Sequence, residues 1–276
     1  MAAMDAQAEY DNMARVAGSQ ELVAGWARDA AGFRAAWPQA ELGLAYGAGD
    51  REKLDLFLPA AGAAGAPVAM FIHGGYWQKL DRSFCSHFAA GLLARGVAVA
   101  LPSYDLAPAV PLARIVAQMQ AAAAWLCRRT GRRVLPLGHS AGGQLTALLM
   151  ATDWRALDPA LPADLTPAGV PISGVFELEP LLPTSIATAL RLNVAEARRL
   201  SPRLLPKPAH TGLHCVVGGA ESPEFLRQSR DFATAWGGSL AVQEGLNHLT
   251  VLDPLRDAAS PLVARAAEMA WALAPA

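Results

Sequence analysis

The chain has 276 residues, a formal net charge of −1 and a pI near 6.6, which fits one large domain without a basic field. This balance argues against nucleic acid or an anionic membrane surface as a partner. No apolar run is long enough to span a bilayer, and the first residues lack the pattern of a secretory signal, so a cytoplasmic location is expected. Cys85, Cys127 and Cys215 are scattered, which predicts buried free thiols rather than a disulfide framework.

Short apolar runs alternate with helical patterns along most of the chain. The predicted strands are 54–58, 68–72, 97–101, 134–137, 170–173, 213–217 and 240–242. The predicted helices are 84–94, 112–129, 141–152, 224–236 and 261–273. Continuous apolar strands separated by helices are typical of a mostly parallel sheet covered on both faces. The sequence therefore predicts a single domain, 1–276, with a doubly wound α/β fold.

Two segments do not follow this alternation. Residues 1–36 look helical and precede the first predicted strand, while residues 177–205 carry a helical pattern between two core strands. Both are candidates for a small helical cap over an active site. A helical addition at the edge of the sheet is the alternative.

A glycine-rich motif, GHSAGG at residues 138–143, follows the predicted strand 134–137 and opens the next helix. This is the G-x-S-x-G nucleophile elbow in its strand–turn–helix context. The small residues permit a strained turn that lifts the serine hydroxyl out of the sheet. We expect Ser140 to be the nucleophile of a serine hydrolase with the α/β-hydrolase fold, and His139 to be structural.

A second glycine-rich turn, HGGYW at residues 73–77, follows the predicted strand 68–72. Its position matches the loop that supplies backbone amides to developing negative charge in esterases and lipases. We expect the amides of Gly74, Gly75 and Ala141 to form the oxyanion hole. His73 is expected to anchor the loop through hydrogen bonds.

The base is expected among the histidines after the elbow, because the order in this fold is serine, acid, histidine. His214 lies inside a predicted strand, and His210 lies in the proline-rich connection before it. His248 follows the last predicted strand and precedes the final helix, which is where the base of this fold lies. The sequence therefore predicts His248 as the base.

The acid is expected just after the predicted strand 213–217. Glu221 is the first carboxylate there and lies in a loop, whereas Glu224 falls in the first turn of a helix, where the helix dipole favours a carboxylate. Asp253 follows His248 and breaks the expected order. We favour Glu221, whose task would be to orient the imidazole and stabilise its protonated form.

Four segments together resemble the kynurenine formamidases (arylformamidases), α/β-hydrolases related to the hormone-sensitive-lipase-like esterases. They are HGGYW at 73–77, YDLAP at 104–108, GHSAGG at 138–143 and ESPEF at 221–225. The resemblance extends from about residue 10 to residue 261. It implies Ser140 as nucleophile, Glu221 as acid and His248 as base.

Two positions depart from the pattern of that group. The stretch SGVFEL at 173–178 often reads S-G-x-Y-D-L, so Phe176 and Glu177 replace Tyr and Asp. Gln144 follows the elbow where many relatives have histidine. Both departures bear on which substrate is natural, and they leave the residues of the hydrolytic reaction unchanged.

The resemblance implies hydrolysis of a small aryl formamide such as N-formyl-kynurenine through a formyl-enzyme, as a step of tryptophan breakdown. A broad carboxylesterase acting on small acyl esters is the alternative, and a catalytically inactive binding module is a remote third. Tyr76, Trp77 and Phe176 are candidates for an apolar pocket around the aryl group, with core packing as the competing role. No cofactor or metal is expected, because the sequence has neither a ligand cluster nor a nucleotide motif. The expected partner is a small aryl amide or ester, and a homodimer stays open.

Overall fold

The computed structural model describes residues 5–60, 65–209 and 212–274, and within them eight strands form one sheet in the order β1-β2-β4-β3-β5-β6-β7-β8. The strands are β1 (Ala40–Ala45), β2 (Lys53–Phe57), β3 (Val68–Ile72), β4 (Ala98–Pro102), β5 (Val134–His139), β6 (Ala168–Ile172), β7 (Gly212–Gly218) and β8 (Ser239–Gln243). β1 and β2 are antiparallel to their neighbours, and the strands from β4 to β8 are parallel. The doubly wound fold and all seven predicted strands are confirmed.

Helices surround this sheet. The α-helices are α1 (Ala6–Tyr10), α2 (Asn12–Arg15), α3 (Ser19–Ala36), α4 (Ala90–Ala94), α5 (Leu112–Thr130), α6 (Ala141–Met150), α7 (Trp154–Leu157), α8 (Ser185–Leu190), α9 (Val194–Arg199), α10 (Pro223–Trp236) and α11 (Pro261–Ala272). Short 3-10 turns lie at η1 (Arg82–Phe84), η2 (Ser86–Ala89), η3 (Glu179–Leu181), η4 (Pro202–Leu204) and η5 (Thr250–Arg256). The predicted helix 84–94 thus begins as 3-10 turn and becomes α-helix only in its second half, the short α4.

Local sequence explains where the long helices begin and end. Ser222 precedes Pro223 and caps α10 by accepting a hydrogen bond from the Phe225 amide. α10 ends at Gly237, which adopts the left-handed conformation with φ 64°. α11 begins in the same way, with Ser260 capping a helix that starts at Pro261.

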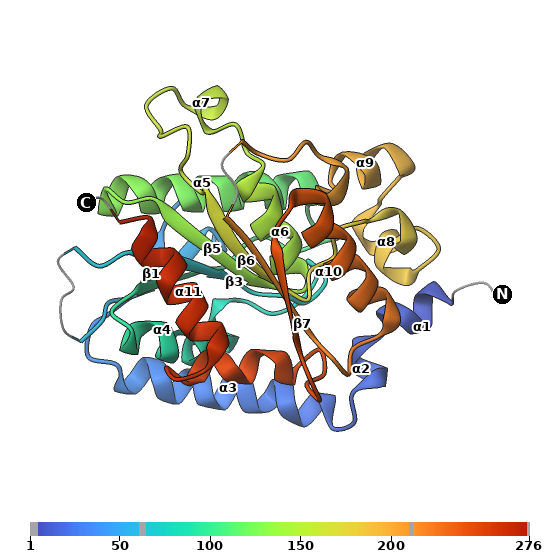
Figure 1. Cartoon of the computed structure of the whole chain (residues 1–276), viewed down its shortest axis with the longest axis horizontal. Coiled ribbons are helices and arrows are strands. Elements are labelled where there is room, and N and C mark those ends of the chain that lie inside the picture. The colour runs from blue at the N-terminus through green and yellow to red at the C-terminus, as the bar shows by residue number, and fades with distance from the viewer. Residues whose placement is uncertain (1–4, 61–64, 210–211, 275–276) are drawn as a thin grey trace.

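The central parallel strands β3, β4, β5 and β6 are buried on both faces, and alternate residues face two separate cores. In β3, Val68, Met70 and Ile72 belong to the core beneath α5 and α6, while Ala69 and Phe71 face the core beneath α3, α4 and α11. Figure 1 shows α5 and α6 on one side of the sheet and α3 and α4 on the other. Burial on both faces explains why these strands read as continuous apolar runs.

The strand order reverses around β3, because β4 pairs with one edge of β3 and β5 with the other. At such a switch point the loops leaving two adjacent strands diverge and open a crevice. The last paired residues of the two strands are Ile72 and Gly138, so HGGYW and GHSAGG leave the sheet side by side. The fold thus brings together the two glycine-rich motifs.

β1 is the strand that the sequence did not indicate. It is an edge strand with partly exposed residues, and its register with β2 is interrupted between Glu41 and Leu44. Gly43 within it has φ 69°. An irregular edge strand lacks both the continuous apolar run and the strict alternation that mark other strands.

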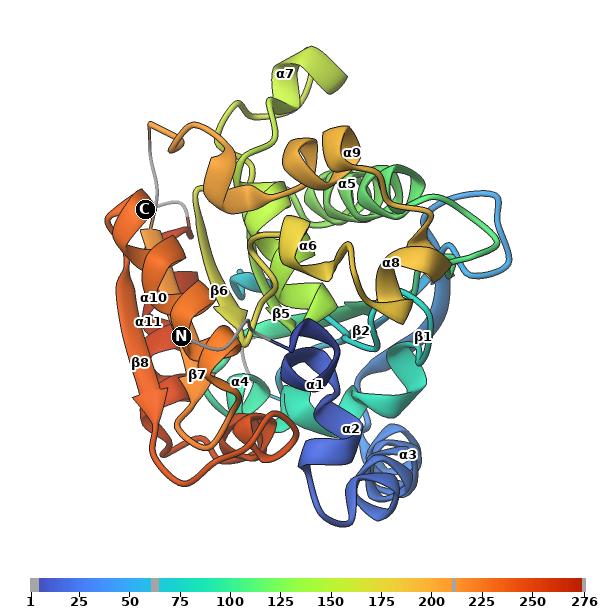
Figure 2. The ribbon, with the colours of Figure 1, turned by 90° about the vertical axis from the view of Figure 1, so that its right-hand side faces the viewer.

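The two segments outside the alternation meet in space. α1 and α2 come from the segment 1–36, and α8 and α9 from the segment 177–205. The side chain of Gln7 accepts hydrogen bonds from the amide and hydroxyl of Ser185, at 3.0 and 3.2 Å. Figure 2 shows α1 and α8 side by side in front of the ends of the central strands.

Two further expectations concern the chain as a whole. Cys85, Cys127 and Cys215 are all buried and unpaired, as predicted. Among the residues that the structure describes, no helix has the length and apolar character needed to cross a membrane.

Replacing Gly142 tests the contact that fixes the helix after the elbow. A Cβ at this position would lie 2.0 Å from the carbonyl oxygen of Ile72, so we expect Gly142→Ala to destabilise the protein by about 3 kcal/mol. The control is Gly32→Ala on α3, where a Cβ meets no atom within 4 Å and should stabilise by about 0.5–1 kcal/mol. Urea unfolding measures both, and an equal response of the two variants would contradict this packing.

Candidate active site

Ser140 lies at the turn between β5 and α6 in a strained backbone conformation. Its φ of 56° and ψ of −116° are rare for a residue with a side chain, and its amide donates to the Ile172 carbonyl at 2.9 Å. The residue is 2% exposed and lines a cavity of about 370 Å³ that His248 and Tyr76 also line. A volume of this size suits a small organic molecule.

Two side chains predicted as base and acid form a buried pair. Nδ1 of His248 lies 2.6 Å from Oε2 of Glu221, and because a carboxylate can only accept, Nδ1 is the donor. The remaining ring nitrogen, Nε2, is then free to accept a proton. The side chain of Glu221 is fully buried, so its charge depends on the hydrogen bonds that it receives.

Glu221 receives those hydrogen bonds from two further strand ends. Its Oε1 accepts from the Ser173 hydroxyl at 2.5 Å and from the Gly218 amide at 2.7 Å. Ser173 follows β6 and Gly218 ends β7, so the carboxylate joins two neighbouring strands. Ser173 was not among the residues that the sequence predicted for the site.

The alternative acids and bases are placed elsewhere. Glu224 bonds to Tyr10 of α1 and to Arg227 and Gln228 of its own helix, α10. His214 contacts Ser239 on the neighbouring strand, and Asp253 lies in η5 after His248. His210 lies outside the described residues.

The loop after β3 approaches Ser140 closely. A Cβ on Gly74 would lie 3.1 Å from the Ser140 Cβ and 3.0 Å from the His139 carbonyl, and Gly75 has φ 101°. Within the described residues, the amides of Gly74 and Gly75 donate to no hydrogen bond. Ala141 begins α6, where an amide has no partner inside the helix. Three backbone donors are therefore available around the serine.

His73 holds the start of this loop, as expected. Its Nδ1 donates to the Gly74 carbonyl at 2.8 Å, and its ring stacks on Tyr104 with centroids 4.2 Å apart. The Tyr104 hydroxyl in turn donates to the His73 carbonyl at 2.9 Å. Burial lowers the pKa of His73 to about 4, so the ring is neutral near pH 7.

His139 connects the elbow to the loop that carries His248. Its Nε2 donates to the His248 carbonyl at 2.8 Å, and the two rings lie 4.6 Å apart. Burial, with the proximity of His248, lowers the pKa of His139 well below its usual value. His139 is thus a neutral structural residue that fixes the backbone of His248.

The predicted pocket residues separate into two groups. Tyr76 lines the cavity. Trp77 and Phe176 are fully buried: Trp77 donates to the Gln144 side chain at 3.2 Å, and Phe176 stacks on Phe232 at 4.2 Å. The structure places both in the core, which was the competing role.

Much of the cavity wall comes from the N-terminal segment. The lining from this segment includes Gln7, Tyr10, Asp11, Asn12, Met13, Val23 and Trp26, and Ile186 of α8 joins them. Sequence reasoning anticipated a cap from these segments but named none of these residues. Short helices with mixed polar and apolar residues carry no motif that would single them out.

Comparisons with known proteins concern the fold and the class of protein. The BD-FAE family matches residues 54–165. Kynurenine formamidases from Salmo salar and Danio rerio are each 29% identical to this chain, over 79% and 71% of it and 78% and 69% of their own length. A solved structure described as a proposed thioesterase, from Silicibacter sp. TM1040, is 36% identical with a TM-score of 0.85, covering 95% of this chain and 98% of that one.

Esterase B from Lactobacillus rhamnosis has a TM-score of 0.68 at 19% identity over 96% of both chains, a likeness of fold. The fold and these relatives define the chain as an α/β-hydrolase and an enzyme that catalyses hydrolysis. The chain is an esterase-like protein of this fold, and kynurenine formamidases are among its homologues at 29% identity.

The lowered pKa values of His73 and His139 make the stability of the protein depend on pH. A histidine whose pKa is lower in the folded state than its unfolded value of about 6.5 takes up a proton on unfolding, so stability falls as pH drops below that value. The contribution of neutral His73 to the free energy of unfolding is roughly 3 kcal/mol, and it is lost once the pH has fallen to about 4. NMR titration of the ring protons should leave His73 and His139 neutral down to pH 5, and titration of either near its ordinary pKa would contradict their assigned burial.

Proposed function

We propose that this protein is an arylformamidase in which Ser140 is the nucleophile, His248 the base and Glu221 the acid. The observation that carries the proposal is the buried His248–Glu221 pair, which leaves the other ring nitrogen free at the cavity that Ser140 lines. A serine that is held in a strained turn and lines the same cavity as such an imidazole is suited to become an activated nucleophile.

The reaction would proceed in two steps. Ser140 Oγ attacks the formyl carbon while His248 takes its proton, and the amides of Gly74, Gly75 and Ala141 stabilise the oxyanion. His248 then protonates the departing aryl amine, leaving a formyl ester on Ser140. Water, deprotonated by His248, attacks this ester and releases formate.

Two observations favour a formamide as the substrate: the activity of the relatives and the charged residues at the cavity. Kynurenine formamidases are among the relatives, and the formyl carbon of a formamide carries only a hydrogen, which needs no pocket of its own. Asp11 and Lys79 line the cavity, are exposed, and belong to no ion pair within the described part of the chain. N-formyl-kynurenine carries an ammonium and a carboxylate that would match these two charges.

The segments 1–36 and 177–205 would serve as a cap on this single domain. Residues of α1, α2 and α8 line the cavity, and the Gln7–Ser185 hydrogen bonds join the two segments above it. The cap would therefore select the leaving group, since the acyl side is defined by the oxyanion loop.

A carboxylesterase acting on small acyl esters is the second candidate. Solved structures with the same fold include esterases, and an ester is intrinsically easier to cleave than an amide. The same three residues would perform both reactions, so the substrate decides between them.

The central test compares kcat/KM for N-formyl-L-kynurenine and for p-nitrophenyl acetate. We expect preference for the formamide, and a loss of more than about 10⁴-fold for both substrates in Ser140→Ala. Urea unfolding of the variant serves as the control for folding. Turnover of the ester alone would assign a carboxylesterase, and full activity of the variant would refute the triad.

Ser173 provides a second test, because its hydroxyl is one of the donors to Glu221. Ser173→Ala should lower kcat/KM about tenfold, the effect of one lost hydrogen bond to a buried charge. Ser229→Ala is the matched control, since Ser229 is also fully buried but its hydroxyl has no partner among the described residues. Equal losses in the two variants would contradict the role assigned to Ser173.

A further inference from the structure

The N-terminal segment links two parts of the active site that are otherwise separate. The Tyr10 side chain makes the first contact: its hydroxyl donates to Glu224 Oε1 at 2.9 Å. Glu224 lies in the first turn of α10, the helix that follows the acid loop. The Tyr10 backbone makes the second contact: its carbonyl accepts a hydrogen bond of 2.6 Å from the hydroxyl of Tyr76 in the oxyanion loop. Tyr10 thus contacts both elements.

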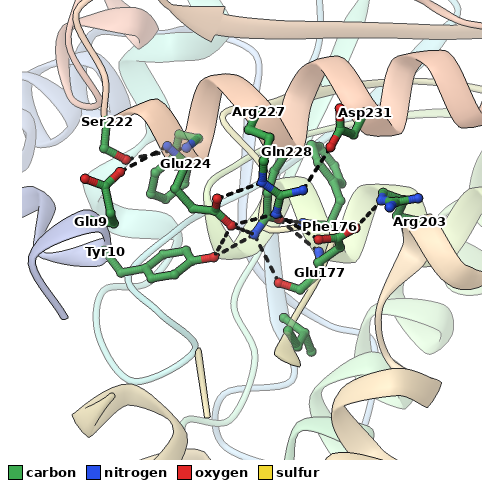
Figure 3. A network of polar contacts seen from close by, with 12 residues as sticks. Glu9, Tyr10, Phe176, Glu177, Arg203, Ser222, Glu224, Arg227, Gln228 and Asp231 are labelled. Atoms are coloured by element: carbon green, nitrogen blue, oxygen red, sulfur yellow. Dashed lines mark hydrogen bonds and ion pairs between the residues drawn. The ribbon is translucent and has the colours of Figure 1, made fainter. Parts of the chain in front are cut away.

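The contact with α10 is rigid because it belongs to a buried polar network, drawn in Figure 3. Gln228 donates to the Tyr10 hydroxyl at 2.6 Å and to Glu224 at 2.9 Å, while Arg227 donates to both oxygens of Glu224 at 2.8 Å. The backbone amides of Phe176 and Glu177 bind the same Gln228 at 2.6 and 2.9 Å. Tyr10, Glu224 and Gln228 are nearly inaccessible to solvent.

In this network the carboxyl group of Glu224 is held charged and the hydroxyl of Tyr10 is held neutral. Burial alone would raise the pKa of Glu224, but hydrogen bonds from Arg227, Gln228 and Tyr10 outweigh it and hold the pKa below its usual value. Burial, reinforced by Glu224, raises the pKa of the Tyr10 hydroxyl, which therefore stays a neutral donor. The Tyr10 side chain is thus held against α10 by buried hydrogen bonds.

The Tyr10 carbonyl contacts the oxyanion loop, whose backbone is strained at Tyr76. Tyr76 has φ 50°, a left-handed conformation that is unfavourable for a residue with a side chain, and it directly follows Gly74 and Gly75. Its hydroxyl donates to the Tyr10 carbonyl and accepts from the Asn12 side chain at 3.1 Å. Removing that hydroxyl leaves the strain in place and takes away the contacts that hold it.

We propose that Tyr76 is a positioning residue whose hydroxyl, held by Tyr10 and Asn12, keeps the amides of Gly74 and Gly75 aligned with the oxyanion. This inference rests on the proposed function, because it requires Ser140 to form a tetrahedral intermediate. Hydrogen-bond donors stabilise a transition state only when they are aligned in advance, so a small displacement costs turnover more than binding.

Tyr76→Phe tests this role against a closely matched variant. Tyr46 is a buried tyrosine whose hydroxyl donates to the Ser103 carbonyl at 2.5 Å, away from the cavity, so Tyr46→Phe removes the same kind of hydrogen bond. We expect Tyr76→Phe to lower kcat about tenfold with KM changed less than about twofold, and Tyr46→Phe to change kcat less than about twofold. The rate at which a small fluorophosphonate labels Ser140 should fall in parallel with kcat.

The outcomes separate this inference from the proposed function. Loss of kcat and of labelling rate in Tyr76→Phe alone, at equal stability to urea, supports the positioning role. Unchanged kcat, a change confined to KM, or equal losses in both tyrosine variants overturns it while the triad stands. If Ser140 in the folded wild-type protein is not labelled at all, both the proposed function and this inference fail.

Discussion

Helix α6 approaches strand β3 so closely that only glycine fits between them, and the geometry of the site depends on this approach. A Cβ on Gly142 would lie 2.0 Å from the Ile72 carbonyl oxygen, and one on Gly138 would lie 2.2 Å from that of Gly142. The chain therefore turns sharply between β5 and α6, and Ser140 absorbs the turn with φ 56°. The same approach sets the first amide of α6 beside the loop that leaves β3, so one contact positions both the proposed nucleophile and the proposed amide donors.

Burial imposes a second constraint, which concerns charge. A carboxylate without solvent contact is unfavourable unless it is paired and hydrogen-bonded. Glu221 meets this condition with one donor each from Ser173, Gly218 and His248. Because the donors come from the ends of β6 and β7 and from the loop after β8, the carboxylate also fixes the relative positions of three neighbouring connections. Its electrostatic and structural roles are therefore inseparable.

The sequence predicts the features that depend on local pattern. Buried parallel strands appear as apolar runs, and two loops appear as glycine motifs after particular strands. Ser140 is therefore predicted from a motif, and Glu221 and His248 are predicted from their positions after predicted strands. Contacts between distant segments leave no such pattern. Ser173 differs in nothing from other serines until the fold brings it to Glu221. Aromatic residues pose the same difficulty, because Tyr76 lines the cavity while the adjacent Trp77 is buried in the core.

Most residues with a strained backbone follow the C-terminal ends of the central strands, where these contacts are made. In the described part of the chain, the residues other than glycine with positive φ are Tyr76, Trp77, Leu80, Ser140, Ser173 and Arg191. All but Arg191 lie just after β3, β5 or β6, at the ends of the three central strands that face the cavity. Such conformations cost about 1–3 kcal/mol each and persist only where surrounding contacts determine them. Here the contacts are the Tyr10 carbonyl for Tyr76, the Ile172 carbonyl for Ser140 and the Glu221 carboxylate for Ser173. Stability gained in the sheet and the N-terminal segment thus supports a site whose own backbone is unfavourable.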